Sequence, residues 1–369
     1  MYMETKDIEY MNRAIALARK GTGWVNPNPL VGAVLVKDGR IIGEGWHERC
    51  GGLHAERNAF RNCRESAEGA TLYVTLEPCC HYGKTPPCTE AVIENRIARV
   101  VVGLTDPNPL VAGKGIAQLR AAGIEVVAGV EEAAIRDLNR VFLKYITTGL
   151  PWVVLKTAMT LDGKIAAYTG DSKWVTGEAA RHRVQEMRSE HMAIMAGIGT
   201  VRADDPLLNC RLEGDIRQPV RVVVDSGATI GMDTQLVRTA GMYRTIVAHL
   251  SNADAGRLQA LDAIGAELLV CREKAGRVDV GDLLRQLGKK GIDSVLLEGG
   301  GELNASFVRE RLVDEVRAFI APKIIGGRDA KTPVEGAGFA RMADALEFTD
   351  CRMEQVGTDF LLSGFLQKS

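Results

Sequence analysis

The chain carries His54-Ala55-Glu56, then Glu77-Pro78-Cys79 and, after a short loop, Pro87-Cys88. Histidine and cysteine are side chains that bind Zn²⁺, and three protein ligands leave the fourth tetrahedral position open for water. A catalytic site is built in this way, whereas a purely structural zinc site takes four protein ligands. The three segments therefore predict Zn²⁺ held by His54, Cys79 and Cys88.

Glu56 lies two residues after the histidine and is predicted to move protons. Zn²⁺ lowers the pKa of a coordinated water to about 7. A carboxylate beside that water can take its proton and deliver it to a ring nitrogen and to departing ammonia. A His-x-Glu motif followed by Pro-Cys and a second cysteine is typical of zinc deaminases, which have two residues between the cysteines. Here eight residues separate Cys79 from Cys88, so the motif is a variant with an inserted loop.

The local pattern favours this interpretation. His54 to Phe60 follows two glycines and is expected to begin a helix, and Thr71 to Leu76 alternates as a strand that leads into Cys79. Cys88 is expected to open a second helix. A helix N-terminus suits a thiolate, because its dipole and free N–H groups favour negative charge.

Two neighbouring residues leave the ligand set open. Cys80 is adjacent to Cys79 and either could bind the metal, although the Pro-Cys pattern favours Cys79 and leaves Cys80 as a buried or supporting thiol. His81 is a competing ligand. A structural zinc site would recruit Cys80 or His81 as its fourth ligand.

Length and composition set outer bounds. A chain of 369 residues favours two domains, and a hydrophobic content of 46% can fill two cores. The net charge of −1 argues against a broad nucleic-acid surface. No apolar stretch reaches the roughly 18 residues of a membrane span, and the charged N-terminus lacks a signal-peptide core. Eight cysteines in a chain of this length suggest reduced thiols and a cytoplasmic protein.

Strand and helix patterns alternate through the first half of the chain. A helix is expected over 7–20, strands over 31–36 and 40–46 joined by an Asp38-Gly39 turn, and further strands over 99–103 and 124–127. Alternation of this kind predicts a three-layer α/β/α sheet. An amphipathic helix over 131–145 leads to Thr148-Gly149-Leu150-Pro151. We place the boundary there, with domains 1–147 and 148–369.

The second half continues the alternation without a dinucleotide fingerprint. Gly197-Ile198-Gly199-Thr200-Val201-Arg202 comes nearest to Gly-x-Gly-x-x-Gly and fails at its last position. Buried strands are expected over 152–158, 221–225 and 293–297, and the last runs into Glu298-Gly299-Gly300-Gly301 before a helix. Glycines between a strand and a helix N-terminus can hold a phosphate, because a ligand can approach the backbone N–H groups there. A tight turn without a ligand is the alternative.

The first half resembles a known family. The stretch from Asn26 to Val34, the segment His54-Ala55-Glu56 and the run Glu77 to Cys88, with its His-x-Gly-x-Thr-Pro-Pro loop, are similar to the bifunctional deaminase-reductase of bacterial riboflavin biosynthesis. The resemblance implies a cytidine-deaminase-like domain with Zn²⁺ on His54, Cys79 and Cys88 and Glu56 as the proton shuttle. It also implies that Asn28 lines the substrate pocket, and that His47 and Lys84 contact the substrate's ribose 5-phosphate.

The second half resembles the reductase of the same family. The segments 158–166, 197–208 and 297–300 carry this likeness, and the first of them is similar to dihydrofolate-reductase-like domains. The resemblance implies an NADPH-dependent reduction of a ribosyl side chain to ribityl. The residues implied in NADPH binding are Ala158, Trp174, Thr200, Asp204, Ser226, Gly300, Gly301, Glu302, Leu303, Asn304, Ala305 and Ser306. The residues implied in substrate binding are Ser172, Arg188, Leu208, Arg211 and Glu298.

Chemistry makes several of these residues reasonable. Arg188 and Arg211 can bind a phosphate in bidentate fashion, and Glu298 can accept hydrogen bonds from sugar hydroxyls. The reaction also needs a proton when the hydride arrives. Asp204 and Lys156 are the ionisable candidates, and water is a third.

The leading hypothesis is therefore two consecutive enzymes acting on a phosphorylated pyrimidine, with a homo-oligomer expected from the family. A second hypothesis is a nucleic-acid base deaminase with an accessory domain. It needs a basic groove or stacking aromatics, and 5% aromatic residues give it little support. A third is a zinc-stabilised scaffold or nucleotide sensor without activity. That hypothesis leaves Glu56 without a role, so a silent Glu56→Ala variant would favour it.

Overall fold

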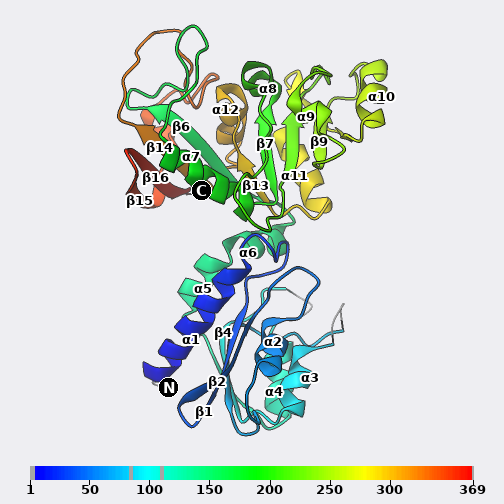
Figure 1. Cartoon of the computed structure of the whole chain (residues 1–369), viewed down its shortest axis with the longest axis vertical. Helices are drawn as coiled ribbons and strands as arrows, with labels where there is room; N and C mark the ends of the chain where they lie inside the picture. The colour runs from blue at the N-terminus through cyan, green and yellow to red at the C-terminus, as the bar shows by residue number, and fades with distance from the viewer. Residues whose placement is uncertain (1–4, 83–85, 109–111, 368–369) are drawn as a thin grey trace. The chain divides into compact units, whose positions relative to one another are not determined.

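A computed structural model describes residues 5–82, 86–108 and 112–367. The chain divides into two compact units, Met1–Gly149 and Leu150–Ser369. Both are built from strands and helices in alternation along the chain (Figure 1). Each unit is described by itself.

The first unit contains a five-stranded sheet with the order β2-β1-β3-β4-β5. Strands β3, β4 and β5 are parallel, and β1 runs antiparallel to β2 and β3. The hairpin between β1 and β2 turns at Asp38 and Gly39, whose φ angles of 50° and 75° suit a type I′ turn. The strands are β1 (Gly32–Lys37), β2 (Arg40–Trp46), β3 (Thr71–Leu76), β4 (Arg99–Leu104) and β5 (Glu125–Ala128).

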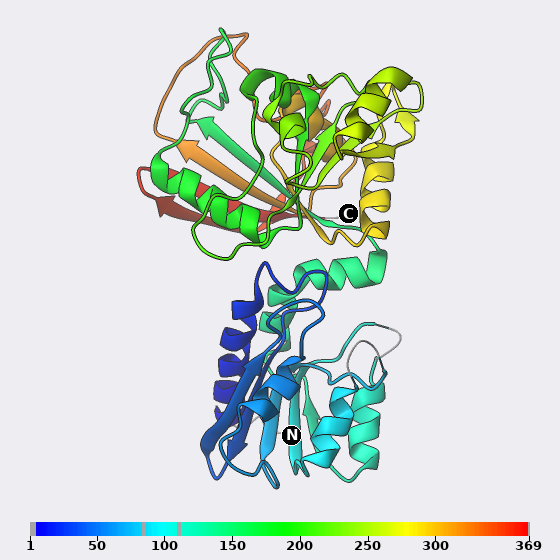
Figure 2. The same cartoon turned by 45° about the vertical axis from the view of Figure 1, so that its right-hand side comes forward.

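Helices cover both faces of this sheet (Figure 2). Helices α1, α5 and α6 contribute to the core on one face, and α2, α3 and α4 to the core on the other. The helices are α1 (Thr5–Ala18), continued by a 3₁₀ turn (Arg19–Gly21), α2 (Ala55–Arg61), α3 (Cys88–Glu94), α4 (Lys114–Ala121), α5 (Glu132–Leu138) and α6 (Arg140–Thr148).

Successive side chains of strand β1 point to opposite faces of the sheet, which gives the unit a core on each face. Val34 and Val36 pack in the core beneath α1, and Ala33 and Leu35 pack in the opposite core. At Gly32 an added Cβ would lie 2.0 Å from the Ala14 carbonyl oxygen, so α1 can approach β1 only over a glycine. The mixed α/β architecture expected for this half is confirmed.

One predicted helix is two helices. The periodic segment 131–145 is interrupted at Asn139, which is almost completely buried. The Asn139 side chain accepts a hydrogen bond from the Leu30 N–H (2.8 Å) and donates one to the Leu30 carbonyl (3.0 Å). This tertiary contact favours a break that the local pattern does not contain, and α6 begins in a new direction.

The second unit contains a nine-stranded sheet with the order β10-β9-β8-β7-β13-β6-β14-β16-β15. The seven strands from β10 to β14 in this order are parallel, and β16 and β15 continue antiparallel at one edge. The strands are β6 (Trp152–Thr160), β7 (Ala193–Gly197), β8 (Val220–Val224), β9 (Thr245–His249), β10 (Glu267–Val270), β13 (Ser294–Leu297), β14 (Glu315–Ala321), β15 (Phe348–Val356) and β16 (Asp359–Leu366).

Two helices pack on one face of this sheet and four on the other. Helices α11 and α12 share a core with Val153 and Leu155, whereas Val154 between them faces α7. Helices α8, α9 and α10 cover the remaining strands of the second face. The helices are α7 (Glu178–Glu190), α8 (Ile198–Asp204), α9 (Gln235–Arg238), α10 (Ala255–Ala263), α11 (Val280–Lys289) and α12 (Gly301–Arg309), with a small hairpin of β11 (Glu273–Lys274) and β12 (Arg277–Val278) and a 3₁₀ turn (Met342–Asp344).

The predicted strands of this half are present to within two residues at either end, because each is a short apolar run buried on both faces. Among the described residues, no helix has both the length and the apolar character needed to cross a membrane.

Candidate active sites

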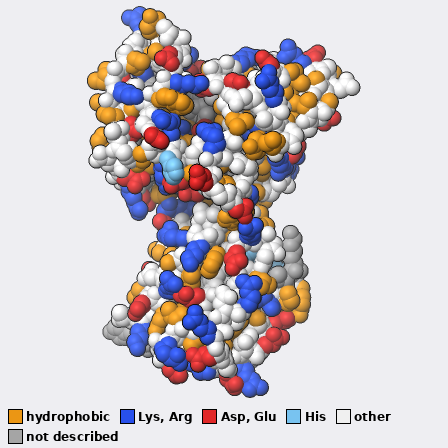
Figure 3. Space-filling view, in the orientation of Figure 1, with side chains coloured by type: hydrophobic (Ala, Val, Ile, Leu, Met, Phe, Trp, Pro, Cys, Tyr) orange, Lys and Arg blue, Asp and Glu red, His pale blue; other side chains and the backbone are white. Residues whose placement is uncertain are grey.

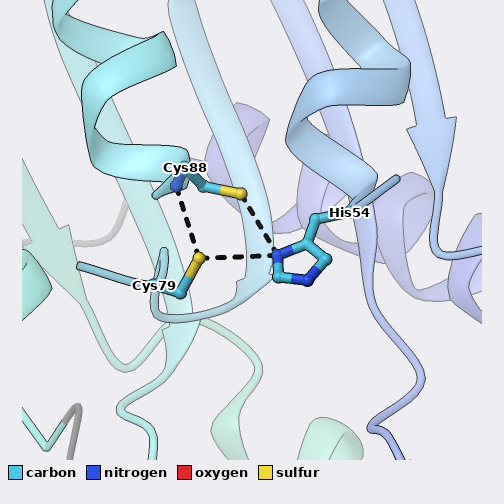
Figure 4. Close-up of side chains that lie close together, drawn as sticks. All are labelled: His54, Cys79 and Cys88. Carbon is cyan, nitrogen blue, oxygen red and sulfur yellow. Dashed lines mark hydrogen bonds between the residues drawn. The ribbon is translucent and has the colours of Figure 1, made fainter. Parts of the chain in front are cut away.

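Three elements of the first unit bring the predicted metal ligands together (Figure 4). His54 is the N-cap of α2, Cys88 is the first residue of α3, and Cys79 follows strand β3. Both cysteine sulfurs face the same ring nitrogen, His54 Nδ1, at 3.4 Å for Cys79 and 3.3 Å for Cys88. The ligand atoms of the three residues all lie within 4.8 Å of one another.

These distances fit a zinc ion. With Zn–S near 2.3 Å and Zn–N near 2.0 Å in a tetrahedron, sulfur and nitrogen ligands lie about 3.5 Å apart. The two sulfur–nitrogen separations, 3.4 and 3.3 Å, are close to that value. The donor set of one imidazole and two thiols is also one that zinc prefers. Of the described residues, these three form the group that could hold a metal.

The groups around Cys79 favour its thiolate form. Hydrogen bonds from the Cys88 thiol and from the His54 ring lower the pKa of Cys79 to about 4, against the opposing effect of burial. The Cys88 backbone N–H at the start of α3 also donates to the Cys79 sulfur, at 3.3 Å. The pKa of Cys88 is raised well above its usual value, first by its hydrogen bond to Cys79 and then by burial.

Glu56 lies in the first turn of α2 and is almost completely buried. Burial raises the pKa of its carboxyl group above the ordinary value. A carboxyl group with a raised pKa holds a proton more readily, which suits a group that must accept and return one.

A pocket of about 430 Å³ opens onto these groups, and His54, Glu56 and Cys79 line it. Asn28 and His47 line the same pocket and lie 3.1 Å apart, from the Asn28 side-chain nitrogen to His47 Nε2. His47 Nδ1 lies 3.0 Å from the Leu53 carbonyl oxygen. Burial lowers the pKa of His47, which favours a neutral ring. The predicted contact Lys84 lies outside the described residues.

Cys80 and His81 stand outside the ligand group. Cys80 is half-buried, and burial raises the pKa of its thiol. His81 lines the pocket as an exposed side chain.

Polar residues after strand β4 were missed from the sequence. Asp106 and Asn108 line the pocket, and burial raises the pKa of Asp106. Strands β3 and β4 are parallel, with Leu76 opposite Leu104, so the segments that follow them meet at one edge of the sheet. The polar residues of Asp106-Pro107-Asn108 after a buried strand were the available signal.

In the second unit a buried ion cluster contains two of the predicted substrate residues. Arg188 donates two hydrogen bonds to Glu298, at 2.7 and 2.9 Å, and the Lys156 ammonium lies 3.5 Å from the same carboxylate. Burial opposes the ionisation of Glu298, but the charges of Arg188 and Lys156 outweigh it and hold the pKa of Glu298 at about 2. Glu298 directly follows β13, beside the glycine turn.

Asn209 joins this cluster to a second predicted arginine. Its backbone carbonyl accepts a hydrogen bond from Arg188 (2.9 Å), and its side-chain oxygen accepts one from Arg211 (3.1 Å). Leu208 before it is buried and has a positive φ of 47°. The structure therefore brings Arg188, Arg211, Leu208 and Glu298 to one place, and Asn209 is the connecting residue that the sequence did not reveal.

The glycine turn between β13 and α12 lies beside helix α8. A Cβ added at Gly300 would lie 3.2 Å from Thr200 Oγ1, so these two predicted cofactor residues are neighbours. Gly197 and Gly300 are the N-caps of α8 and α12, and neither helix start has a side-chain cap. The N–H groups there suit the pyrophosphate of a dinucleotide. Gly301 itself is packed against Glu335.

The other predicted cofactor residues, and the predicted substrate residue Ser172, lie on several elements of the second unit. Ser172 donates to Asp204 (2.9 Å), and the exposed Trp174 ring lies under the Arg181 guanidinium at 4.6 Å. Ser226 accepts a hydrogen bond from the Val278 N–H, and Ala158 is a half-buried residue of β6. Within α12, Leu303 is half-buried beside Gly299, Asn304 is buried, and Glu302, Ala305 and Ser306 line a separate pocket of about 320 Å³.

The chain matches known protein families over most of its length. Residues 4–104 match the cytidine and deoxycytidylate deaminase zinc-binding region, and residues 151–362 match the RibD C-terminal domain. The riboflavin biosynthesis protein RibD of Actinobacillus pleuropneumoniae is 51% identical over 356 residues, which cover 96% of this chain and 94% of that protein. The chain belongs to the RibD family.

Further RibD proteins span the whole chain. RibD of Escherichia coli (strain K12) is 40% identical, over 97% of this chain and 98% of its own. A solved structure of Acinetobacter baumannii RibD (form 1) aligns with a TM-score of 0.89 at 40% identity, over 98% of this chain and 99% of that one. As a RibD family member, the chain is a bifunctional enzyme of riboflavin biosynthesis, with a deaminase that uses Zn²⁺ and a reductase that uses NADPH.

Proposed function

We propose that the first reaction is the hydrolytic deamination of 2,5-diamino-6-(5-phosphoribosylamino)pyrimidin-4(3H)-one to 5-amino-6-(5-phosphoribosylamino)uracil, and that the reductase then converts the ribosyl side chain of this product to ribityl. A related Thermotoga maritima protein, 40% identical over 98% of this chain, is described as a deaminase and reductase of these compounds. The observation that carries the proposal is the convergence of His54, Cys79, Cys88 and the buried Glu56 on one pocket.

In the deaminase, His54, Cys79 and Cys88 would hold Zn²⁺, which supplies an acidified water when bound. Glu56 takes one proton from the attacking water and passes it to the pyrimidine nitrogen. It then takes the second proton from the hydroxyl group formed by this addition and passes it to the amino group, which leaves as ammonia while the carbonyl forms. Its raised pKa suits a group that must be protonated and deprotonated in one cycle. We assign Asn28 and His47 to contacts with the substrate, because both line the pocket.

In the reductase, NADPH supplies the hydride when bound, and the protein provides orientation and charge. We assign cofactor binding to Thr200, Gly300 and Trp174, and substrate binding to Arg211 and Glu298. Arg211 is exposed and can reach a phosphate, whereas the guanidinium of Arg188 is committed to Glu298 and Asn209. Arg188 therefore serves to hold Glu298 ready for the sugar hydroxyls.

We assign the deaminase to residues 1–147 and the reductase to residues 148–369. The division of the chain into compact units between Gly149 and Leu150 supports this boundary, and so do the two family matches on either side of it.

We also propose a cytoplasmic homo-oligomer that binds no nucleic acid. All eight cysteines are free thiols, as expected in a reducing compartment. Strand β15 is exposed along most of its length at the edge of the second sheet, and such an edge can pair with another copy. On the face shown in Figure 3, positive and negative side chains are interspersed, unlike a nucleic-acid groove.

The test is NADPH oxidation in the presence of the undeaminated pyrimidine. We expect the wild-type protein to consume NADPH and the Glu56→Ala variant to consume none, while both reduce the deaminated intermediate at equal rates. Glu132→Ala, which removes an exposed carboxylate of α5, is the matched control and should behave as the wild type. If Glu56→Ala oxidises NADPH as fast as the wild type on the undeaminated substrate, the order of reactions or the role of Glu56 is wrong.

A further inference from the structure

Glu77 is a buried carboxylate at the end of strand β3, two residues before the metal ligand Cys79. Among the described residues, three backbone N–H groups donate hydrogen bonds to its two oxygens. One oxygen accepts from the Asp106 N–H at 3.2 Å and from the Gly113 N–H at 2.9 Å, and the other accepts from the Ile116 N–H at 3.1 Å.

These donors belong to the start of helix α4 and to the segment after β4. The first N–H groups of a helix have no partner within the helix, and the N-cap of α4 is Gly113, which has no side chain to cap them. Glu77 supplies the missing acceptor from a position 36 residues earlier in the chain. Charge-assisted hydrogen bonds to backbone N–H groups are among the stronger ones in proteins.

The segment Glu77-Pro78-Cys79 is also held by direct packing. A Cβ added to Gly115 in the first turn of α4 would lie 2.2 Å from the Pro78 carbonyl oxygen, so the helix touches the segment closely. On the other side, the Cys79 carbonyl accepts a hydrogen bond from the Thr89 N–H of α3, at 3.2 Å. The backbone that carries the Cys79 sulfur is therefore fixed between two helices.

We propose that Glu77 is a positioning residue for the metal site, which fixes the Cys79 backbone to helix α4 and slows the release of Zn²⁺. The same carboxylate accepts a hydrogen bond from the backbone of Asp106, which lines the substrate pocket. Glu77 therefore fixes the positions of Cys79 and of this part of the pocket wall relative to each other. The inference rests on the proposed zinc site. Supporting groups around metal ligands typically change metal affinity 10- to 100-fold when they are removed.

The direct test is the Glu77→Gln variant of the full chain. Glutamine keeps the size of the side chain but offers one oxygen to three donors, and its NH₂ group faces a backbone N–H. We expect zinc to transfer to a colorimetric chelator roughly 10-fold faster or more from this variant than from the wild type. Transfer at the wild-type rate would overturn the inference. A wild-type chain that binds no zinc would instead overturn the proposed function.

Asp7→Asn is the matched control for general destabilisation of the first unit. Asp7 is also a buried carboxylate, and it bonds to Arg99 and Tyr73 rather than to the metal segment. We expect this variant to lower the melting temperature and to leave the rate of zinc transfer unchanged. If Asp7→Asn releases zinc as fast as Glu77→Gln, the effect is general and Glu77 has no positioning role.

A measurement on the wild-type chain covers the case in which Glu77→Gln does not fold. Coupling between two sites is reciprocal in binding free energy, so a contact that slows zinc release by tightening zinc binding must itself be strengthened by bound zinc. We expect hydrogen exchange at the Gly113 and Ile116 amides to slow when zinc is bound, and exchange in α1 to change little. Equal exchange at the two amides with and without zinc would overturn the proposal.

Discussion

Three buried carboxylates show how the partners of one residue set its role. Glu56 has its pKa raised by burial, which suits proton transfer. Glu298 has its pKa held at about 2 by Arg188 and Lys156 in spite of burial, so it remains an anion. Asp7 has its pKa lowered mainly by the hydrogen bonds from Arg99. The residue type is similar in each case, and the neighbouring charges decide between chemistry and structure.

The buried Glu298 cluster makes a prediction about stability. Glu298→Gln leaves Arg188 and Lys156 without their anion inside the second unit, and breaking a buried ion pair in this way costs about 3–5 kcal/mol. Urea unfolding followed by hydrogen exchange in β13 measures the loss. The control is Glu267→Gln, which breaks a partly exposed pair with Arg244 and should cost less than about 1 kcal/mol. Equal losses in the two variants would contradict this account.

Asp7 makes a prediction about pH. Its folded pKa lies below the unfolded value of about 3.9, so its stabilising effect is complete above that pH and is lost as the pH falls through the lower, folded pKa. The free energy of unfolding of the wild type should therefore fall more steeply than that of Asp7→Asn as the pH drops from 5 to about 3. Both proteins share the same zinc ligands, so the acid release of zinc cancels in the difference. Parallel pH curves would exclude this role for Asp7.

The sequence revealed the ligand motif but not the contacts around it. His54, Cys79 and Cys88 follow from residue type and spacing, and the structure brings them together as expected. The proposed role of Glu77 depends on backbone N–H groups 29 to 39 residues later in the chain. Asn209 accepts hydrogen bonds from two arginines only because the fold brings them beside it. Motifs encode ligands, whereas contacts of this kind arise only when distant segments pack together.

At the scale of helices and strands, the sequence predicts elements whose signals are local. The strands β1 and β4 follow from short apolar runs and β3 from apolar alternation, and the β1–β2 hairpin follows from the turn residues Asp38 and Gly39. The break between α5 and α6 has no such signal. The break depends on the hydrogen bonds between Asn139 and Leu30, which are 109 residues apart. The periodic pattern on either side of Asn139 predicts a single helix.

Asn139 connects that break to the deaminase pocket. Asn139→Ala leaves the Leu30 N–H and carbonyl without their partners, which costs about 1–3 kcal/mol. Pro27, Asn28 and Pro29 before Leu30 line the pocket, so the KM of deamination should also rise. Steady-state kinetics and thermal unfolding measure the two effects. Asn62→Ala removes an exposed bond to the Glu44 carbonyl and should change neither by a measurable amount.

On the scale of the whole chain, each unit has its own sheet and its own hydrophobic cores. The two cores of the first unit are built from residues before Gly149, and the three cores of the second unit from residues after it. The proposed zinc ligands lie in the first unit, and the glycine turn with Arg188 and Glu298 lies in the second. The two sites are built from residues of different units, so their activities should respond to different perturbations.

Metal removal separates the two activities. Dialysis of the full chain against a zinc chelator should abolish ammonia release from the diaminopyrimidinone substrate, because His54, Cys79 and Cys88 are left without the ion that acidifies the water. NADPH oxidation on the deaminated intermediate should continue within about twofold of its starting rate, since the second unit keeps its core and its ion cluster. Added zinc should restore deamination. Parallel loss of both activities on zinc removal would show that the reductase depends on the metal site and would contradict the independence of the two units.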